Sequence, residues 1–233
     1  MTSHGGEIDG IIFDMDGVLC DSESFICEAA VRLFEVKYGI TVKPADFIPF
    51  VGTGENRYLG GVAEKYGVTL DLRADKQFTY DTYLDLIRGR LRPLAGVESF
   101  TAAARRSGMK LAVASSADKV KVEGNLREIG MLSATFDAIV DGLEVENKKP
   151  APDIFQLAAR RIGLDCEACL VVEDAPNGLQ AGKSAGCRCL GITSSFSHGV
   201  LAGAGADWIC ANLAEVPDEL RRLLFGAGAG TAT

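Results

Sequence analysis

Short apolar segments alternate with longer amphipathic segments over most of the chain, and this alternation limits the fold more than any other feature. Short apolar runs bounded by Gly or polar residues are typical of parallel strands that are covered on both faces. They occupy residues 10–16, 110–117, 136–142, 169–175, 189–193 and 207–210. Helical patterns, each followed by Gly, occupy residues 97–107, 152–162 and 176–185. Strands alternating with helices predict an α/β fold with a parallel sheet and right-handed crossovers.

Residues 24–93 interrupt this alternation, because they contain no convincing strand. Their helical patterns lie over residues 24–39, 55–66 and 71–89. Long inserted segments are usually functional, and this one directly follows the carboxylates of the first strand. We therefore expect a small helical cap at 24–93, inserted into an α/β core of residues 1–23 and 94–226. Residues 227–233 are expected to form a disordered tail.

The net charge and the cysteine content limit the cellular compartment and the binding partners that we expect for this chain. The formal net charge of -8 argues against nucleic-acid binding, which needs clustered Lys and Arg. No run approaches the roughly 18 apolar residues of a membrane span, and the first ten residues lack the pattern of a signal peptide. Seven scattered cysteines, an odd number, favour a reducing compartment. We expect a cytoplasmic protein without a membrane partner, with a reducing organelle stroma as the alternative.

Two cysteine pairs raise the alternative of a structural zinc site. Cys166 and Cys169 form a CxxC pattern, and Cys187 and Cys189 form a CxC pattern. The CxC spacing departs from that of structural zinc sites. Cys169 and Cys189 also lead into predicted buried strands, where a free cysteine serves as a small apolar residue. We therefore favour the apolar role.

Chemically active side chains follow three of the predicted strands or precede a helix. They are Asp14, Asp16, Ser115, Ser116, Glu173, Asp174, Lys148 and Lys149. In an open α/β sheet, ligands bind beyond the carboxyl ends of the strands. Four carboxylates gathered there would repel one another unless a cation held them together, and Mg²⁺ suits carboxylates combined with water and a substrate phosphate. We therefore expect Mg²⁺ to be bound beyond the carboxyl ends of these strands.

Phosphoryl transfer is the reaction that these residue types favour. Asp14 would attack a phosphomonoester, while Lys149 neutralises charge on the transferred group. Asp16 would protonate the leaving alcohol and later deprotonate the attacking water. Ser115 and the amides that follow it, at a helix amino terminus, would hold the phosphate oxygens.

Four segments carry a resemblance to a known family. In chain order, "FDMDGVLCDSE", "VASSA", "KKPAPDIF" and "VVEDAPNG" resemble the four motifs of the haloacid dehalogenase-like (HAD) hydrolase superfamily. The match is to the subgroup with a small helical cap after the first motif, and it covers nearly the whole chain. It implies a Rossmann-like, doubly wound core and an aspartyl-phosphate intermediate.

The resemblance also assigns roles to individual residues. It implies that Asp14 is the nucleophile, Asp16 the general acid/base and Lys149 the lysine of the third motif. Ser115 resembles the serine that holds the phosphate, with Ser116 beside it. The implied Mg²⁺ ligands are Asp14, the backbone carbonyl of Asp16, Asp174 and Glu173, the last bound either directly or through water.

Asp16 and Ile26 narrow the choice within the superfamily. Dehalogenases and phosphonatases of this family lack the second aspartate of the first motif, so Asp16 favours phosphate esters. The sequence "KPAPDIF" most resembles the β-phosphoglucomutase-like subgroup. However, Ile26 or a neighbour occupies the place of the cap histidine of those mutases. We expect a phosphatase acting on a small phosphorylated metabolite. The alternatives are a phosphosugar mutase and a non-catalytic relative that binds a phosphorylated ligand or a partner.

The predicted cap contains a candidate substrate loop, "FVGTGENRYLGG" at residues 50–61. It resembles the cap loop of these enzymes and a hydrolase domain of plant thylakoid multidomain proteins. Glu55, Asn56 and Arg57 are the candidate substrate contacts. Because cap and core must open and close around the substrate, we expect a monomer.

Overall fold

A computed structural model describes residues 7–131 and 133–226. Within these residues the chain forms one parallel sheet of six strands in the order β3-β2-β1-β4-β5-β6. The strands are β1 (Gly10–Phe13), β2 (Lys110–Ala114), β3 (Ala138–Val140), β4 (Cys169–Glu173), β5 (Arg188–Ile192) and β6 (Trp208–Cys210). The predicted α/β fold is confirmed. The predicted tail, residues 227–233, lies outside the described residues.

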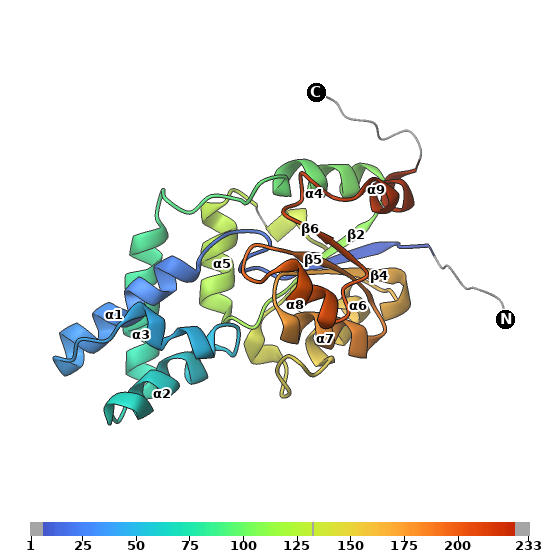
Figure 1. Cartoon of the computed structure of the whole chain (residues 1–233). Helices are drawn as coiled ribbons and strands as arrows, with labels where there is room; N and C mark the ends of the chain where they lie inside the picture. Colours follow the sequence, from blue (N-terminus) through green and yellow to red (C-terminus); the bar gives the residue numbers. More distant parts are fainter. Residues whose placement is uncertain (1–6, 132, 227–233) are drawn as a thin grey trace.

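Helices cover both faces of this sheet (Figure 1). On one face lie α4 (Val97–Arg106), α5 (Lys119–Glu128) and α9 (Asp218–Phe225), and on the other α6 (Asp153–Arg161), α7 (Pro176–Ala185) and α8 (His198–Gly203). Successive strand residues point to opposite faces, so Ile11 and Phe13 pack in the cluster beneath α4 and α5, whereas Ile12 packs beneath α6 and α7. The sheet is therefore doubly wound, as predicted.

Three helices between β1 and α4 lie together beside one end of the sheet (Figure 1). They are α1 (Glu23–Tyr38), α2 (Glu55–Tyr66) and α3 (Leu72–Ile87). An antiparallel bridge between Cys20 and Pro93 holds together the two chain segments that enter and leave this helical cap. An ion pair of 2.5 Å between Lys76 and Asp118 joins α3 to the start of α5. No helix within residues 7–131 and 133–226 has the length and hydropathy needed to cross a membrane.

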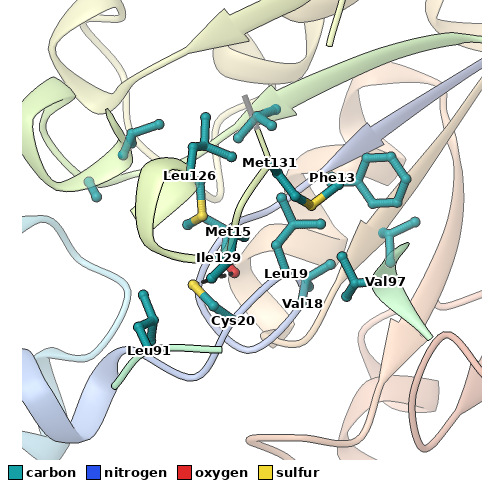
Figure 2. Close-up of a cluster of buried hydrophobic side chains, with 14 of the residues drawn as sticks. Phe13, Met15, Val18, Leu19, Cys20, Leu91, Val97, Leu126, Ile129 and Met131 are labelled. Atoms are coloured by element: carbon teal, nitrogen blue, oxygen red, sulfur yellow. Dashed lines mark hydrogen bonds between the residues drawn. The ribbon is translucent and has the colours of Figure 1, made fainter. Parts of the chain in front are cut away.

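A buried apolar cluster supports the loop that follows β1 (Figure 2). Phe13, Met15 and Leu19 contribute to it from β1 and this loop, and Leu126 and Ile129 contribute from α5 and its end. The intervening carboxylates, those of residues 14 and 16, instead line the cavity described below. Burial of the apolar residues thus fixes the direction in which the two aspartates point.

Candidate active site

A cavity of about 570 Å³ lies between the carboxyl ends of the central strands and the helical cap. Seven of the eight chemically active core residues line it: Asp14, Asp16, Ser115, Ser116, Lys149, Glu173 and Asp174. The eighth, Lys148, instead donates to the carbonyls of Gly142 and Val145. From the cap and its loop, Ile48, Phe50, Glu55 and Tyr58 complete the wall. The fold therefore brings the four sequence motifs to one site.

Lys149 forms the centre of the charged network. Its Nζ lies 2.6 Å from Asp14 Oδ1 and 2.7 Å from Glu173 Oε1, and its side chain is only 3% exposed. Burial alone lowers the pKa of Lys149, but the two carboxylates outweigh it and hold the pKa above its ordinary value. Lys149 is therefore a fixed positive charge beside Asp14.

Glu173 positions this lysine. Its Oε2 accepts hydrogen bonds from the N–H groups of Asp174 and Ala175, both at 2.9 Å, while Oε1 binds Lys149. Both oxygens thus have protein donors, and these contacts hold Glu173 as a partner of Lys149. A Cβ on Gly178 would lie 1.7 Å from Glu173 Oε1, so this arrangement requires glycine at the start of α7.

Asp14 and Asp174 are two neighbouring buried carboxylates. Burial raises the pKa of Asp14 to about 7, with the charges of Glu173 and Asp16 adding to the shift and Lys149 opposing it. Burial, followed by the charges of Glu173 and Asp14, raises the pKa of Asp174 well above its ordinary value. Such a pair gains from a bound cation, because the cation stabilises both ionised forms.

The donor set fits magnesium. Gly17 has a φ of +78°, and a Cβ there would lie 2.0 Å from Asp174 Oδ2, so the glycine lets Asp174 approach the loop that carries Asp16. Within the described part of the chain no three His, Cys, Asp or Glu side chains converge as a closed metal site. A magnesium ion would instead be held by the carboxylates of Asp14 and Asp174, the Asp16 carbonyl, water and substrate phosphate, which is the open coordination that Mg²⁺ prefers.

Ser115 directly follows β2 and is nearly fully buried. Its N–H donates to the Val140 carbonyl at 3.0 Å, and its Oγ accepts the Ala117 N–H at 3.1 Å. The Ser115 hydroxyl proton is thus free to be donated to a phosphate oxygen in the cavity. Ser116 lines the same wall.

Asp16 has two partners that the sequence does not predict. Its Oδ2 lies 2.8 Å from Lys121 Nζ on α5, and its Oδ1 accepts the Ser22 hydroxyl. The Lys121 side chain is 5% exposed. Burial lowers the pKa of Lys121, but Asp16, Tyr83, Glu55 and Glu23 together outweigh it, so the pKa lies above its ordinary value. These contacts fix the orientation of Asp16 at the cap side of the cavity.

The three predicted cap contacts separate in the structure. Glu55 lines the cavity, whereas Asn56 and Arg57 are exposed and do not. Arg57 pairs with Glu64 at 2.9 Å and lies 4.8 Å from the centre of the Phe50 ring. The cavity wall therefore gains a carboxylate from α2, not a cation.

All seven cysteines are unpaired. Cys169, Cys187 and Cys189 are buried in the core between the sheet and its helices. Burial raises the pKa of the Cys169 and Cys189 thiols to about 12. These thiols therefore stay protonated and serve as small apolar side chains.

Comparison with known proteins places the chain among hydrolases. A model of the haloacid dehalogenase-like hydrolase family matches residues 8–186. The chain is 39% identical over 214 residues to the chloroplastic protein SUPPRESSOR OF QUENCHING 1 of Arabidopsis thaliana, covering 89% of this chain but only 20% of that protein. It is 31% identical over 219 residues to the putative phosphatase YhcW of Bacillus subtilis, covering 93% of this chain and 96% of YhcW.

Solved structures agree with this placement. CbbY from Rhodobacter sphaeroides, in complex with phosphate, has a TM-score of 0.78 at 27% identity over 89% of this chain and 96% of its own. A putative β-phosphoglucomutase from Thermotoga maritima has a TM-score of 0.70 at 30% identity over 87% and 94% of the two chains. Sequence, fold and the residues of the cavity thus give one answer: the chain belongs to the haloacid dehalogenase-like hydrolase family.

Proposed function

We propose that the protein is a magnesium-dependent phosphatase that hydrolyses a small phosphomonoester through a phosphoryl group carried on Asp14. The observation that carries this proposal is the buried Lys149, which contacts Asp14 at 2.6 Å and Glu173 at 2.7 Å beside Ser115. Such a site offers a nucleophile, a fixed positive charge and a hydroxyl donor to one phosphate group.

The chain's own residues supply each step. A carboxylate oxygen of Asp14 forms a bond to phosphorus as the bond from phosphorus to the leaving alcohol breaks. Asp16 gives its proton to the departing oxygen and then takes one from the water that attacks the phosphorus. That attack breaks the bond to Asp14 and releases inorganic phosphate. Bound Mg²⁺ would shield the repulsion between Asp14 and the phosphate.

The surroundings of Ile26 favour hydrolysis over a mutase reaction. Ile26 is buried and lines the cavity, where an apolar side chain offers no proton-transfer group. Proteins similar to this chain carry both phosphatase and phosphoglucomutase names, so a phosphosugar mutase is the second candidate. A non-catalytic role has less support, because no residue of the four motifs is missing.

A phosphorylated metabolite is the expected substrate. Structures of CbbY from Rhodobacter sphaeroides contain phosphate and, in a variant, xylulose 1,5-bisphosphate. The net charge of -8 also favours a small ligand over nucleic acid. We expect a monomer in the cytoplasm or in a reducing organelle stroma, a setting that the seven unpaired cysteines support.

The test is phosphate release from a panel of small phosphomonoesters, with Mg²⁺ or with EDTA. We expect release that needs Mg²⁺ and falls to background in Asp14→Asn, a substitution that keeps the shape of the side chain. Conversion of β-glucose 1-phosphate to glucose 6-phosphate without net release would favour the mutase. Equal release by wild type and Asp14→Asn would refute the proposed nucleophile.

A further inference from the structure

The cap side of the catalytic cavity is acidic. Seven carboxylates but only two lysines are among the described residues that line the cavity. Four of these carboxylates, Asp14, Asp16, Glu173 and Asp174, are the predicted catalytic and metal-binding residues. The other three, Asp21, Glu23 and Glu55, lie at the start of the cap and on α2. The part of the substrate that faces the cap therefore meets negative charge.

Glu55 is the carboxylate with an unpartnered oxygen, although the charge of Lys121 and the hydroxyl of Tyr80 both lie within its electrostatic reach. It is 7% exposed, lines the cavity, and its Oε2 forms no hydrogen bond with any described residue. A buried carboxylate oxygen without a donor is unfavourable, so such a group is a candidate for binding a ligand. Glu23 differs, because its Oε1 accepts the Tyr58 hydroxyl at 2.9 Å.

Both lysines of the cavity are already engaged. Lys149 contacts Asp14 and Glu173, and Lys121 contacts Asp16 at 2.8 Å. Among the described residues, the cap therefore contributes no cationic side chain to the cavity wall. A second phosphate or a carboxylate on the substrate would face Glu55 with no cation from the cap beside it, because the nearby Lys121 is already paired with Asp16.

Glu55 lies near the phosphate-binding side of the cavity. The loop before it contacts the core, because a Cβ on Gly54 would lie 3.7 Å from the Ser116 carbonyl oxygen. Ile48 and Phe50 also line the cavity and add an apolar surface to it. A leaving group in this part of the cavity can thus pack carbon atoms on the loop and direct a polar group to Glu55.

We propose that the cap side of the cavity selects a phosphomonoester whose leaving group donates a hydrogen bond to Glu55, from a hydroxyl or an ammonium group, and carries no second anionic group. The substrate class is a polyol or amino-alcohol monophosphate. This inference rests on the proposed phosphatase function and specifies the part of the substrate that does not react.

The test compares esters that match in size but differ in the group that faces the cap. A six-carbon series consists of glucose 6-phosphate, glucosamine 6-phosphate, 6-phosphogluconate and glucose 1,6-bisphosphate. A two-carbon series consists of 2-hydroxyethyl phosphate, phosphoethanolamine and phosphoglycolate. The length of the leaving group is thus varied separately from its charge. We expect kcat/KM to be about tenfold or more higher for the best hydroxyl or ammonium ester than for any anionic one, since charged hydrogen bonds and like-charge contacts differ by that much or more.

Three variants assign this preference to Glu55. Glu55→Gln keeps the side-chain shape and should reduce the preference at least fivefold, with a thermal midpoint close to that of wild type. Glu64→Gln changes an exposed carboxylate on the same helix and should leave the preference unchanged. Tyr80→Phe removes a buried hydroxyl beside Glu55 and Asp118, whose pKa is raised by burial and by the charges of these two carboxylates, while the Glu55 carboxylate stays in place. It should also leave the preference unchanged.

Each outcome decides the inference. An anionic ester as the best wild-type substrate would overturn it while leaving the phosphatase proposal intact. An unchanged preference in Glu55→Gln, or an equal loss in Glu55→Gln and Tyr80→Phe, would also overturn it. No release from any ester, including p-nitrophenyl phosphate, would overturn the proposed function and this inference together.

Discussion

Removal of the Lys149 charge should destabilise the fold as well as abolish activity. Lys149→Met leaves Asp14 and Glu173 buried without the ammonium that now contacts both, at 2.6 and 2.7 Å. Breaking a buried ion pair by removing one partner typically costs about 3–5 kcal/mol. Because the lysine side chain is 3% exposed, solvent screening does not reduce this cost. We expect the free energy of unfolding to fall by about that amount at pH 8.

The cost should also increase with pH. Burial raises the pKa of Asp14 to about 7 in the wild type, even though Lys149 opposes the shift. Without Lys149 the pKa rises further, so above pH 7 the folded variant holds a proton that the folded wild type has lost. Where the folded state binds one proton more than the unfolded state, the free energy of unfolding falls by about 1.4 kcal/mol for each unit of pH increase. The cost of the substitution should therefore be larger at pH 9 than at pH 6.

Urea unfolding followed by circular dichroism, in EDTA at pH 6, 8 and 9, measures this directly. Lys183→Met is the matched control, because Lys183 pairs with Asp207 at 2.8 Å but the two side chains are 38% and 33% exposed. Surface pairs contribute about 0–1 kcal/mol, so this control should change little. A cost below 1 kcal/mol for Lys149→Met, or a cost independent of pH, would refute the account of Lys149 as a buried counter-ion.

Two further substitutions test the neighbouring contacts. Gly178→Ala places a Cβ 1.7 Å from Glu173 Oε1 and should lower kcat at least about tenfold by displacing the partner of the lysine. Its control is Gly60→Ala, because a Cβ at Gly60 meets no atom within 4 Å. This substitution should stabilise α2 by about 0.5–1 kcal/mol without changing kcat. Lys121→Met removes the 2.8 Å partner of Asp16 and should lower kcat by about tenfold or more; a kcat within twofold of wild type in steady-state assays would contradict that role.

The catalytic side of the cavity is predictable because its residues adjoin strong local signals. Asp14 directly follows an apolar run, and Glu173 ends another. The carboxyl ends of parallel strands lie at one edge of a sheet, so position in the sequence is enough to bring these side chains together. Lys149 lies on a loop, and it is found through the resemblance of its motif and not through periodicity.

Helix α5 shows why Lys121 is not predictable in the same way. The sequence "KVKV" at residues 119–122 alternates with period two, as a strand does, and Gly124 weakens the helical pattern further. In the helix that forms, Lys121 is buried while Val120 is 36% exposed, the reverse of what side-chain polarity indicates. The ion pair with Asp16 stabilises this arrangement, and that contact spans 105 residues of sequence.

The cap contacts were predictable only as a group. Glu55, Asn56 and Arg57 are consecutive on α2, where successive side chains point about 100° apart. One of three such residues can face the cavity while the others face solvent. Which one does so depends on how the helix is rotated by its packing, and Tyr58, Leu59 and Val62 set that rotation through their burial.

The role of Asp14 as nucleophile is tested most directly by the mass of the intact protein, quenched in acid during turnover of a phosphomonoester with Mg²⁺. We expect one added phosphoryl group in the wild type, assigned by peptide fragmentation to Asp14, and none in Asp14→Asn. Steady phosphate release without any such adduct, or an adduct on another residue, would contradict the assignment of Asp14 as the nucleophile.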